Sequence, residues 1–266
     1  MHVEIVIPAR YQSSRYPGKP LALLTGATGV DKPLIQRSFE AALQVRGTHA
    51  VHVATDDSRI AKAVKAFGGS VIMTPVACAN GTERVAAALT GLHADTDVIV
   101  NFQGDALLTP PALVEGLIDH MRSHPECRAA TVAVRCSPSA YRHLIGDQAE
   151  GRVGGTTAVV DAQGNALYFS KRVLPHIPPG DPLELDPPVL LHLGLYAYRR
   201  EALQHYGQCP ATRLEQIEGL EQLRFLVHGM PMFVLQADPP DWDTIELNNP
   251  SDKAPIEAIL TSRSII

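Results

Sequence analysis

The sequence has few of the features that mark secreted, membrane-embedded or metal-stabilised proteins. Only four of its 266 residues are cysteines, and these are scattered, without a CxxC pair, at Cys78, Cys127, Cys136 and Cys209. This spacing argues against a structural zinc site or a disulfide framework, so we expect buried, reduced thiols. No apolar run is long enough to span a bilayer, and the amino terminus lacks the basic and apolar segments of a signal peptide.

Excess positive charge is also absent. The chain has 23 Lys and Arg against 28 Asp and Glu, which gives a net charge of −5 and a pI near 6.1. No global positive field is therefore available to attract nucleic acid or an anionic membrane. The composition is that of an ordinary globular protein, with 45% hydrophobic residues. We expect a soluble, cytoplasmic protein with no nucleic-acid partner and no membrane insertion.

Apolar strand patterns alternate with amphipathic helix patterns in the first half of the chain. Strands are predicted at 3–7, 50–55, 70–74 and 97–102, and helices at 34–44, 58–67 and 83–92. This alternation predicts an α/β fold with right-handed βαβ units on a mostly parallel sheet. Ligands bind outside the carboxyl ends of such strands. The loops that begin at Pro8, Asp56 and Gln103 should therefore converge.

The second half has a different pattern. Strand-like segments lie at 129–134, 156–161, 166–170 and 190–198, with a hairpin turn predicted at Asp161-Ala-Gln-Gly164. A helix is predicted at about 214–228, and the proline-rich stretch 175–188 is expected to be a surface loop. A mixed-sheet extension of the parallel sheet fits this order of elements.

A basic loop follows the first predicted strand. Residues 8–20 read PARYQSSRYPGKP and contain Arg10, Arg15 and Lys19. A triphosphate needs backbone N–H groups at close range and cations at more than one phosphate, and this loop offers both. It matches neither the GxxxxGK[ST] loop nor the GxGxxG fingerprint. A solvated basic loop is the alternative, but its place directly after a strand favours phosphate binding.

Two further segments have the residues of a nucleotide site. NGTER at 80–84 puts a glycine at a helix start, where backbone can approach a base. The alternative is a helix N-cap at Thr82, which is compatible with ligand contact. VIVNFQGD at 98–105 ends an apolar strand at Asp105, where a Mg²⁺–nucleotide complex needs its anchor. The alternative there is a turn aspartate without a ligand.

These motifs resemble those of the CMP-Kdo synthetases, a family of sugar nucleotidyltransferases in which Kdo is 3-deoxy-manno-octulosonate. PAR-x-x-S-x-R-x-PGKPL is the signature loop of that family, and NGTER and QGD correspond to its SGTER and QGDEP segments. ALYFSK at 166–171, HLGLYAYR at 192–199 and LEQIEGLEQLR at 214–224 nearly repeat family stretches. The resemblance runs from Ile5 to Leu260.

The resemblance implies a Rossmann-like nucleotidyltransferase fold and transfer of CMP from CTP to the anomeric hydroxyl of an acidic sugar, with release of pyrophosphate. Kdo or a related ulosonic acid would be the acceptor, Mg²⁺ the cofactor and lipopolysaccharide biosynthesis the setting. It also implies a single cytidylyltransferase domain over 1–266. Residues 1–125 would mainly bind nucleotide, and residues 126–266 would mainly bind the acceptor and form a homodimer.

The resemblance also implies roles for individual residues. Lys19, Arg10 and Asp105 would be catalytic, with Asp105 as a metal ligand. The implied nucleotide contacts are Pro8, Ala9, Arg10, Ser13, Arg15, Lys19, Gly81, Thr82, Glu83 and Arg84. The implied sugar contacts are Gln103, His192, Tyr196 and Glu215.

Three departures from the family pattern concern the metal and the acceptor. Ala106-Leu107 replaces Glu-Pro after QGD, and Thr157 replaces a lysine. The second metal aspartate of the family lies in VDTPEDL, which WDTIELNNPSD matches in two ways. Aligning DT with DT nominates Asp243, whereas aligning TPED with NPSD nominates Asn248. The second alignment keeps the following helix in register and is slightly favoured, although Asn248 is a weaker, neutral ligand.

Other functions are compatible with these residues. The same chemistry could serve another acceptor, such as an amino-sugar analogue of Kdo or a phosphonate. A regulatory protein that lost catalysis with its second carboxylate would bind CTP without releasing pyrophosphate. A glycosyltransferase of related fold would need a DxD-like metal motif, and QGDA is a poor one.

Overall fold

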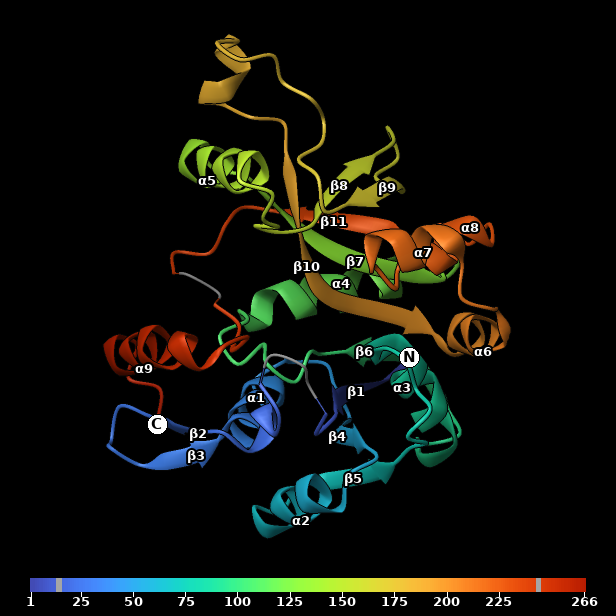
Figure 1. Ribbon diagram of the computed structural model, residues 1–266. Helices are drawn as coiled ribbons and strands as arrows, with labels where there is room; N and C mark the ends of the chain where they lie inside the picture. The colour runs from blue at the N-terminus through green and yellow to red at the C-terminus, as the bar shows by residue number, and fades with distance from the viewer. Residues whose placement is uncertain (13–15, 243–244) are drawn as a thin grey trace. The chain divides into compact units, whose positions relative to one another are not determined.

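The computed structural model describes residues 1–12, 16–242 and 245–266 (Figure 1). Its internal contacts divide the chain into two compact units, Met1–Ile118 with Pro240–Ile266 and Asp119–Pro239. The carboxyl-terminal segment therefore belongs to the first unit, although it lies far from the rest of that unit in sequence. The expectation of one functional domain with a nucleotide half and an acceptor half stays a prediction.

A parallel sheet forms the centre of the first unit. In sheet order its strands are β6 (Thr96–Asn101), β1 (His2–Ala9), β4 (Ala50–Thr55) and β5 (Ser70–Met73). Val3, Ile5 and Val53 are fully buried, as continuous apolar strands are when helices cover both faces of a sheet. Because β1, β4 and β6 are parallel neighbours, their carboxyl ends lie at one edge. The predicted convergence of the loops after these strands is confirmed.

The remaining elements of the first unit connect and cover these strands. Its helices are α1 (Leu34–Leu43), α2 (Ser58–Ala66), α3 (Gly81–Ala87) and α9 (Lys253–Ser262), while α4 (Pro111–Ser123) crosses into the second unit. Strands β2 (Leu23–Thr25) and β3 (Asp31–Pro33) form a short antiparallel pair. Among the described residues of this unit there are three 3₁₀ turns: η1 (Lys19–Leu21), η2 (Ala88–Gly91) and η4 (Pro250–Asp252).

The second unit contains a mixed sheet. Its strands are β7 (Ala129–Arg135), β8 (Thr157–Val160), β9 (Ala166–Ser170), β10 (Leu190–Arg199) and β11 (Phe233–Ala237). β7 pairs antiparallel with β10 and parallel with β11, and the hairpin of β8 and β9 pairs with β10. The predicted hairpin turn is present, because the Gly164 amide donates to the Asp161 carbonyl at 3.1 Å.

The helices of the second unit correct one prediction. They are α5 (Pro138–Ala149), α6 (Arg200–Gln208), α7 (Arg213–Glu218) and α8 (Leu223–Val227), with a 3₁₀ turn η3 (Pro182–Leu185) inside the proline-rich loop. The single helix predicted at 214–228 is wrong. Gly219 has a φ of +61° and ends α7 in the left-handed region that glycine favours. The chain then turns, and α8 begins at Leu223.

Nowhere in the described part of the chain is a helix both long and apolar enough to cross a bilayer.

Candidate active site

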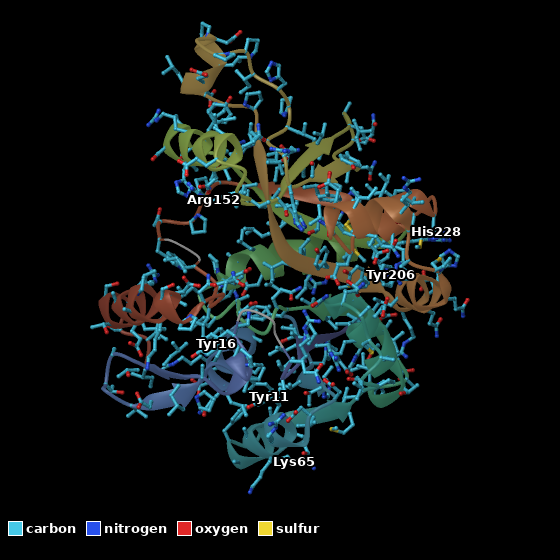
Figure 2. The ribbon with its side chains drawn as sticks, viewed as in Figure 1. Tyr11, Tyr16, Lys65, Arg152, Tyr206 and His228 are labelled. Atoms are coloured by element: carbon cyan, nitrogen blue, oxygen red, sulfur yellow. The ribbon has the colours of Figure 1, made fainter. Side chains whose placement is uncertain are left out.

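The loop after β1 is closed at its base by backbone contacts. The Gly18 amide donates to the Tyr11 carbonyl at 2.9 Å, and Gly18 has a φ of +74°, which favours glycine. A Cβ at Gly18 would also lie 3.1 Å from the Tyr11 ring. Figure 2 labels Tyr11 and Tyr16 near this edge of the first unit. The closed base returns the chain to the end of β1, where Lys19 begins η1.

The predicted phosphate contacts of this loop differ in exposure. Ala9 is buried at the end of β1, Arg10 is exposed, and Pro8 and Lys19 are half-buried. Ser13 and Arg15 lie outside the described residues. The exposed cation of Arg10 is therefore available to a ligand in solution, whereas Lys19 already has a partner within the protein.

A cation that the motifs did not predict lies beside this loop. The Arg59 guanidinium on α2 lies 3.3 Å from the centre of the Tyr11 ring, a cation–π contact. It also pairs with Asp57 at 2.7 Å, and this hydrogen bond to Arg59 holds the pKa of Asp57 below its usual range. Nothing in the order of residues at 56–59 signals the contact, because Tyr11 is far away in sequence.

The QGD loop after β6 packs against the end of β1. The Phe102 amide donates to the Val6 carbonyl at 3.0 Å, which extends the strand pairing toward the loop. A Cβ at Gly104 would lie 2.9 Å from the Pro8 carbonyl oxygen, so only glycine fits at this distance. From α1, the buried Ser38 hydroxyl donates to the Gly104 carbonyl at 2.9 Å. The loop is thereby held on both sides.

Asp105 and Lys19 meet at this edge of the sheet. The Lys19 ammonium donates to the Asp105 carboxylate, with 2.5 Å between Nζ and Oδ2. Their side chains are 20% and 16% exposed, so both remain within reach of a ligand. Gln103, two residues before Asp105, is half-buried. One ammonium and one carboxylate from two sequence-distant loops thus form the charged centre of the site.

The NGTER segment forms the amino-terminal turn of α3. The cap is Asn80 and not Thr82, since the Asn80 side chain accepts from the Glu83 amide at 2.8 Å. Thr82 is fully buried, whereas Gly81 and Glu83 are half-buried. A helix cap therefore does lie in this segment, as the alternative predicted, but the capping residue is Asn80 and the prediction of Thr82 was wrong. The predicted nucleotide contacts at these positions stay predictions.

Arg84 ties α3 to the loop after β4. It is 3% exposed, pairs with Asp56 at 3.0 Å and donates to the Thr74 hydroxyl at 2.7 Å. A buried guanidinium needs such partners, because an unpaired charge away from water is strongly destabilising. In this structure the side chain of Arg84 joins α3 to Asp56 and Thr74, and its predicted contact with nucleotide stays a prediction.

The Ala106-Leu107 departure joins the QGD loop to the carboxyl-terminal segment. Leu107 and Leu108 pack in one hydrophobic cluster with Leu247 and Leu260. The Trp242 indole donates to the Leu108 carbonyl at 2.9 Å. Leu107 is two residues from Asp105, and Leu247 adjoins Asn248, so this cluster holds the two segments with predicted metal ligands together.

Of the two alternatives for the second metal ligand, only Asn248 can be described. It is half-buried, and its amide donates to the Asp252 carboxylate at 2.8 Å. Asp252 also accepts from the Asn249 amide at 2.6 Å and so caps the helical turn that leads into α9. Asp243 lies outside the described residues. α9 begins at Lys253, directly after NPSD, and the choice between Asn248 and Asp243 stays a prediction.

The described donors suit a metal that arrives with nucleotide. Among residues 1–12, 16–242 and 245–266, no group of three or more His, Cys, Asp or Glu side chains is arranged to hold a metal ion. Mg²⁺ in nucleotide sites needs only one or two carboxylates, because phosphates and water supply the other ligands. Asp105 is such a carboxylate at a strand end, so the residues fit Mg²⁺ carried by a triphosphate.

In the second unit, His192 lies on β10 among aromatic and polar neighbours. Its Nε2 is 2.9 Å from the Thr131 hydroxyl on β7, and its ring packs edge-on against Phe169 with 4.9 Å between centroids. Burial lowers the pKa of His192 to about 3. The imidazole is therefore neutral at physiological pH and can recognise hydroxyls, but it cannot supply a cation.

Tyr196 lies four residues further along β10 and is buried. Its hydroxyl donates to the Gln222 side-chain carbonyl at 3.3 Å, and its ring lies 5.5 Å from that of His192. Gln222 is 2% exposed, and its Nε2 has no hydrogen-bond partner within the described residues. Gln222 was not predicted, since the LEQLR stretch alone does not show which of its side chains faces β10.

Glu215 is held by other residues of the second unit. Its carboxylate makes a two-pronged contact with Arg224, at 2.8 Å to Nε and 2.6 Å to Nη2, and both side chains are buried. It also accepts from the Thr212 amide at 3.1 Å in a capping box. Glu218 instead faces β9 and accepts from the Ser170 hydroxyl at 2.9 Å. The role of Glu215 as a sugar contact stays a prediction.

The Thr157 departure is accommodated inside the second unit. Thr157 is 1% exposed, and its hydroxyl donates to the Arg172 carbonyl at 2.6 Å and accepts from the Leu174 amide at 3.2 Å. The residue therefore fastens the chain after β9. A buried threonine with this geometry offers no charge to an acidic ligand.

Comparisons with known proteins agree on one family. The sequence profile of the cytidylyltransferase family matches residues 5–232. A 3-deoxy-manno-octulosonate cytidylyltransferase of Maricaulis maris is 39% identical over 262 residues, which cover 98% of each chain. An 8-amino-3,8-dideoxy-manno-octulosonate cytidylyltransferase of Shewanella loihica is 42% identical over 250 residues, covering 92% of this chain and 95% of the relative.

Solved structures show the same relationship. CMP:2-keto-3-deoxy-manno-octonic acid synthetase in complex with CTP matches with a TM-score of 0.82 and 35% identity, over 99% of this chain and all of the other. A 4-diphosphocytidyl-2C-methyl-D-erythritol synthase from Anaerococcus prevotii matches with a TM-score of 0.59 at 10% identity, over 97% of this chain and 96% of the other, which shows a shared fold only. The predicted α/β nucleotidyltransferase fold is confirmed.

Proposed function

The chain belongs to the CMP-Kdo synthetase family of cytidylyltransferases, and we propose that it transfers CMP from CTP to Kdo or to its 8-amino analogue. The relatives at 39% and 42% identity act, by their names, on these two acceptors. Both are 3-deoxy-octulosonic acids, so the chemistry of the reacting hydroxyl is the same. The acceptors differ only in the group at carbon 8, far from that hydroxyl.

One observation carries the proposal: the contact between Lys19 and Asp105 at the carboxyl ends of β1 and β6. Nucleotidyl transfer needs positive charge for the departing pyrophosphate and a carboxylate for the metal that accompanies the triphosphate. The Nζ–Oδ2 distance of 2.5 Å puts both groups in one place. A solvated basic loop would not require an acidic partner from a second, sequence-distant loop.

In the proposed reaction, the anomeric oxygen of the sugar attacks the α-phosphorus of CTP in line. The bond from that phosphorus to the bridging oxygen of the β-phosphate breaks, and pyrophosphate leaves. Lys19 and the exposed Arg10 bind the triphosphate and offset the charge that grows on the leaving group. Mg²⁺ held by Asp105 and the phosphates would neutralise charge and lower the pKa of the attacking hydroxyl.

The acceptor is proposed to contact the second unit through β10. His192 is half-buried and neutral, which suits the hydroxyls of a sugar, and Gln103 of the first unit is the fourth proposed sugar contact. Thr157 does not favour either acceptor, because its hydroxyl is taken up by backbone groups.

The test is an acceptor panel read by pyrophosphate release. The full chain is incubated with CTP and Mg²⁺ and with Kdo, 8-amino-Kdo, another ulosonic acid or no acceptor. Release that depends on one of the first two acceptors supports the proposal and identifies the substrate. Silence in all wells, together with measurable CTP binding, would contradict it and favour a regulatory protein.

We also propose that the chain forms a homodimer through its second unit. Leu214 and Ile217 lie one turn apart on α7 and are 42% and 69% exposed, and Val227 at the end of α8 is 49% exposed. Exposed apolar side chains that share a helix face often mark an interface. Sedimentation of the wild type should give a dimer, and Ile217→Glu should shift it toward monomer. A wild-type monomer at micromolar concentration would contradict this proposal.

A further inference from the structure

A bulge in β10 interrupts its pairing with β7, and the Thr131 hydroxyl makes a hydrogen bond there. In the pairing of β10 with β7, Leu193 lies opposite Val132, but Tyr196 lies opposite Thr131. Two residues of β10 are therefore left without a partner in the ladder, and their backbone groups need hydrogen bonds from elsewhere. The buried Thr131 hydroxyl lies 2.7 Å from the Leu195 carbonyl oxygen.

This contact determines where the hydroxyl proton lies. A carbonyl oxygen can only accept, so two oxygens 2.7 Å apart require that Thr131 donate its single proton to Leu195. The hydroxyl lies further, at 3.5 Å, from the Leu193 carbonyl oxygen, and it can then only accept from the Nε2 of His192 at 2.9 Å. His192 must carry a proton on Nε2 in order to donate there.

The other ring nitrogen is consequently an acceptor. His192 is half-buried, and Nδ1 has no hydrogen-bond partner among the residues that the structure describes. Burial also keeps the ring from taking up a second proton near neutral pH, as its lowered pKa indicates. The neutral ring therefore presents a lone pair on Nδ1, which suits the hydroxyl of a polyhydroxylated ligand.

We propose that Thr131 is a positioning residue that fixes His192 in the Nε2–H tautomer, so that Nδ1 accepts a hydrogen bond from a hydroxyl of the sugar acceptor. This inference rests on the proposed function for the identity of the ligand. The tautomer itself follows from the two contacts of the Thr131 hydroxyl, with the Leu195 carbonyl and with His192 Nε2, and exists without any ligand. Two matched substitutions separate the hydroxyl from the bulk of the side chain: Thr131→Val keeps the shape, and Thr131→Ser keeps the hydroxyl.

The first test reads the tautomer directly. Long-range ¹H–¹⁵N correlation spectra of the full chain, labelled at its 11 histidines, are recorded at pH 7 without substrate, and the His192 ring is assigned by its loss in His192→Gln. The inference predicts a protonated Nε2 and an unprotonated Nδ1 in the wild type and in Thr131→Ser. A ring protonated on Nδ1, or on both nitrogens, in the wild type would overturn it.

The second test reads the consequence in kinetics. Thr131→Val should raise the KM for the sugar about tenfold, the effect of roughly one lost hydrogen bond, while the KM for CTP is unchanged. Thr131→Ser should restore the wild-type KM for the sugar, although it removes a methyl group from the same buried place. Equal sugar KM values for Thr131→Val and the wild type, or equal losses in Val and Ser, would overturn the positioning role.

The two tests keep this inference apart from the proposed function. Absence of turnover with Kdo and 8-amino-Kdo would refute the proposed function, and the spectrum would still decide the tautomer. Turnover by a wild type whose His192 is protonated on Nδ1 would refute the inference and leave the proposed function standing.

Discussion

The two units present their chemistry in opposite ways. In the first unit, charged side chains stand in loops at the carboxyl ends of parallel strands, as Lys19 and Asp105 do. In the second unit, the candidate residues His192 and Tyr196 stand on a strand and are neutral and partly or wholly enclosed. The only carboxylate predicted for the sugar, Glu215, is already paired with Arg224.

This difference follows from what each unit is proposed to bind. A triphosphate carries several negative charges, and loops at a strand edge can surround it with cations and backbone N–H groups. The proposed acceptor carries several hydroxyls besides its carboxylate, and hydroxyls are best recognised by hydrogen-bond donors and acceptors fixed on rigid strands. Apart from Gln103, substitutions in the first unit should therefore act on chemistry and CTP, and substitutions in the second on the sugar or on stability.

The largest expected effect is that of Asp105→Asn. The change removes the proposed metal carboxylate but keeps the size of the side chain, so we expect pyrophosphate release to fall by about 100- to 1,000-fold with an unchanged thermal transition. Asp95→Asn, at an exposed position before β6, is the control and should behave as the wild type. Activity of Asp105→Asn within a few-fold of the wild type would remove Asp105 from the metal site.

Lys19→Ala should have the next largest effect. Loss of the ammonium leaves growing charge on pyrophosphate without its partner, so kcat/KM for CTP should fall by about 100-fold. Lys65→Ala on the exposed face of α2 changes the same net charge at a distance and should leave the kinetics unchanged. Identical kinetics in the two variants would show that bulk charge, and not the placement of Lys19, matters.

Glu215→Gln tests whether this carboxylate of the second unit stabilises the fold or contacts the sugar. The substitution leaves the buried Arg224 without a charged partner, so the free energy of unfolding should fall by about 3 kcal/mol. The KM for the sugar should change little in the folded fraction at low temperature. A raised sugar KM with unchanged stability would instead make Glu215 a direct sugar contact, as the family resemblance implied.

The pH dependence of stability is the smallest effect when it is compared per pH unit. Burial lowers the pKa of His192 from 6.5 to about 3, so below pH 6.5 the unfolded chain binds a proton that the native chain does not. The free energy of unfolding should therefore decrease as the pH is lowered from 6.5 to 3, by up to about 1.4 kcal/mol per pH unit from this group. His192→Gln should show a shallower fall than the wild type or the exposed control His176→Gln. Parallel curves for all three proteins would contradict the burial of His192.

The sequence predicts the first unit more completely than the second. Continuous apolar runs and a glycine-containing loop identify β1, β6 and the edge where Asp105 lies, because a parallel sheet brings its strand ends together whatever the details of packing. The structure adds to that prediction the direct contact between Lys19 and Asp105. The cap at Asn80 shows the limit, since neighbouring polar residues compete for the same position.

In the second unit, the decisive contacts depend on features that the order of residues does not show. The bond between Thr131 and His192 exists because a bulge in β10 shifts the register, and sequence periodicity does not locate such a bulge. The break at Gly219 also separates Glu215 on α7 from Gln222, the residue directly before α8. The segment LEQIEGLEQLR therefore resembles the family's sequence, but it does not show which residues its side chains contact.

The most direct test of this division of labour is a pair of kinetic matrices. Pyrophosphate release is measured with CTP and the preferred sugar varied independently, for the wild type, Lys19→Ala and Thr131→Val. We predict that Lys19→Ala impairs the use of CTP while the KM for the sugar stays unchanged, and that Thr131→Val raises the KM for the sugar while the use of CTP stays unchanged. Equal changes in the kinetic constants for CTP and for the sugar, in both variants, would contradict the separation of nucleotide and sugar recognition between the two units.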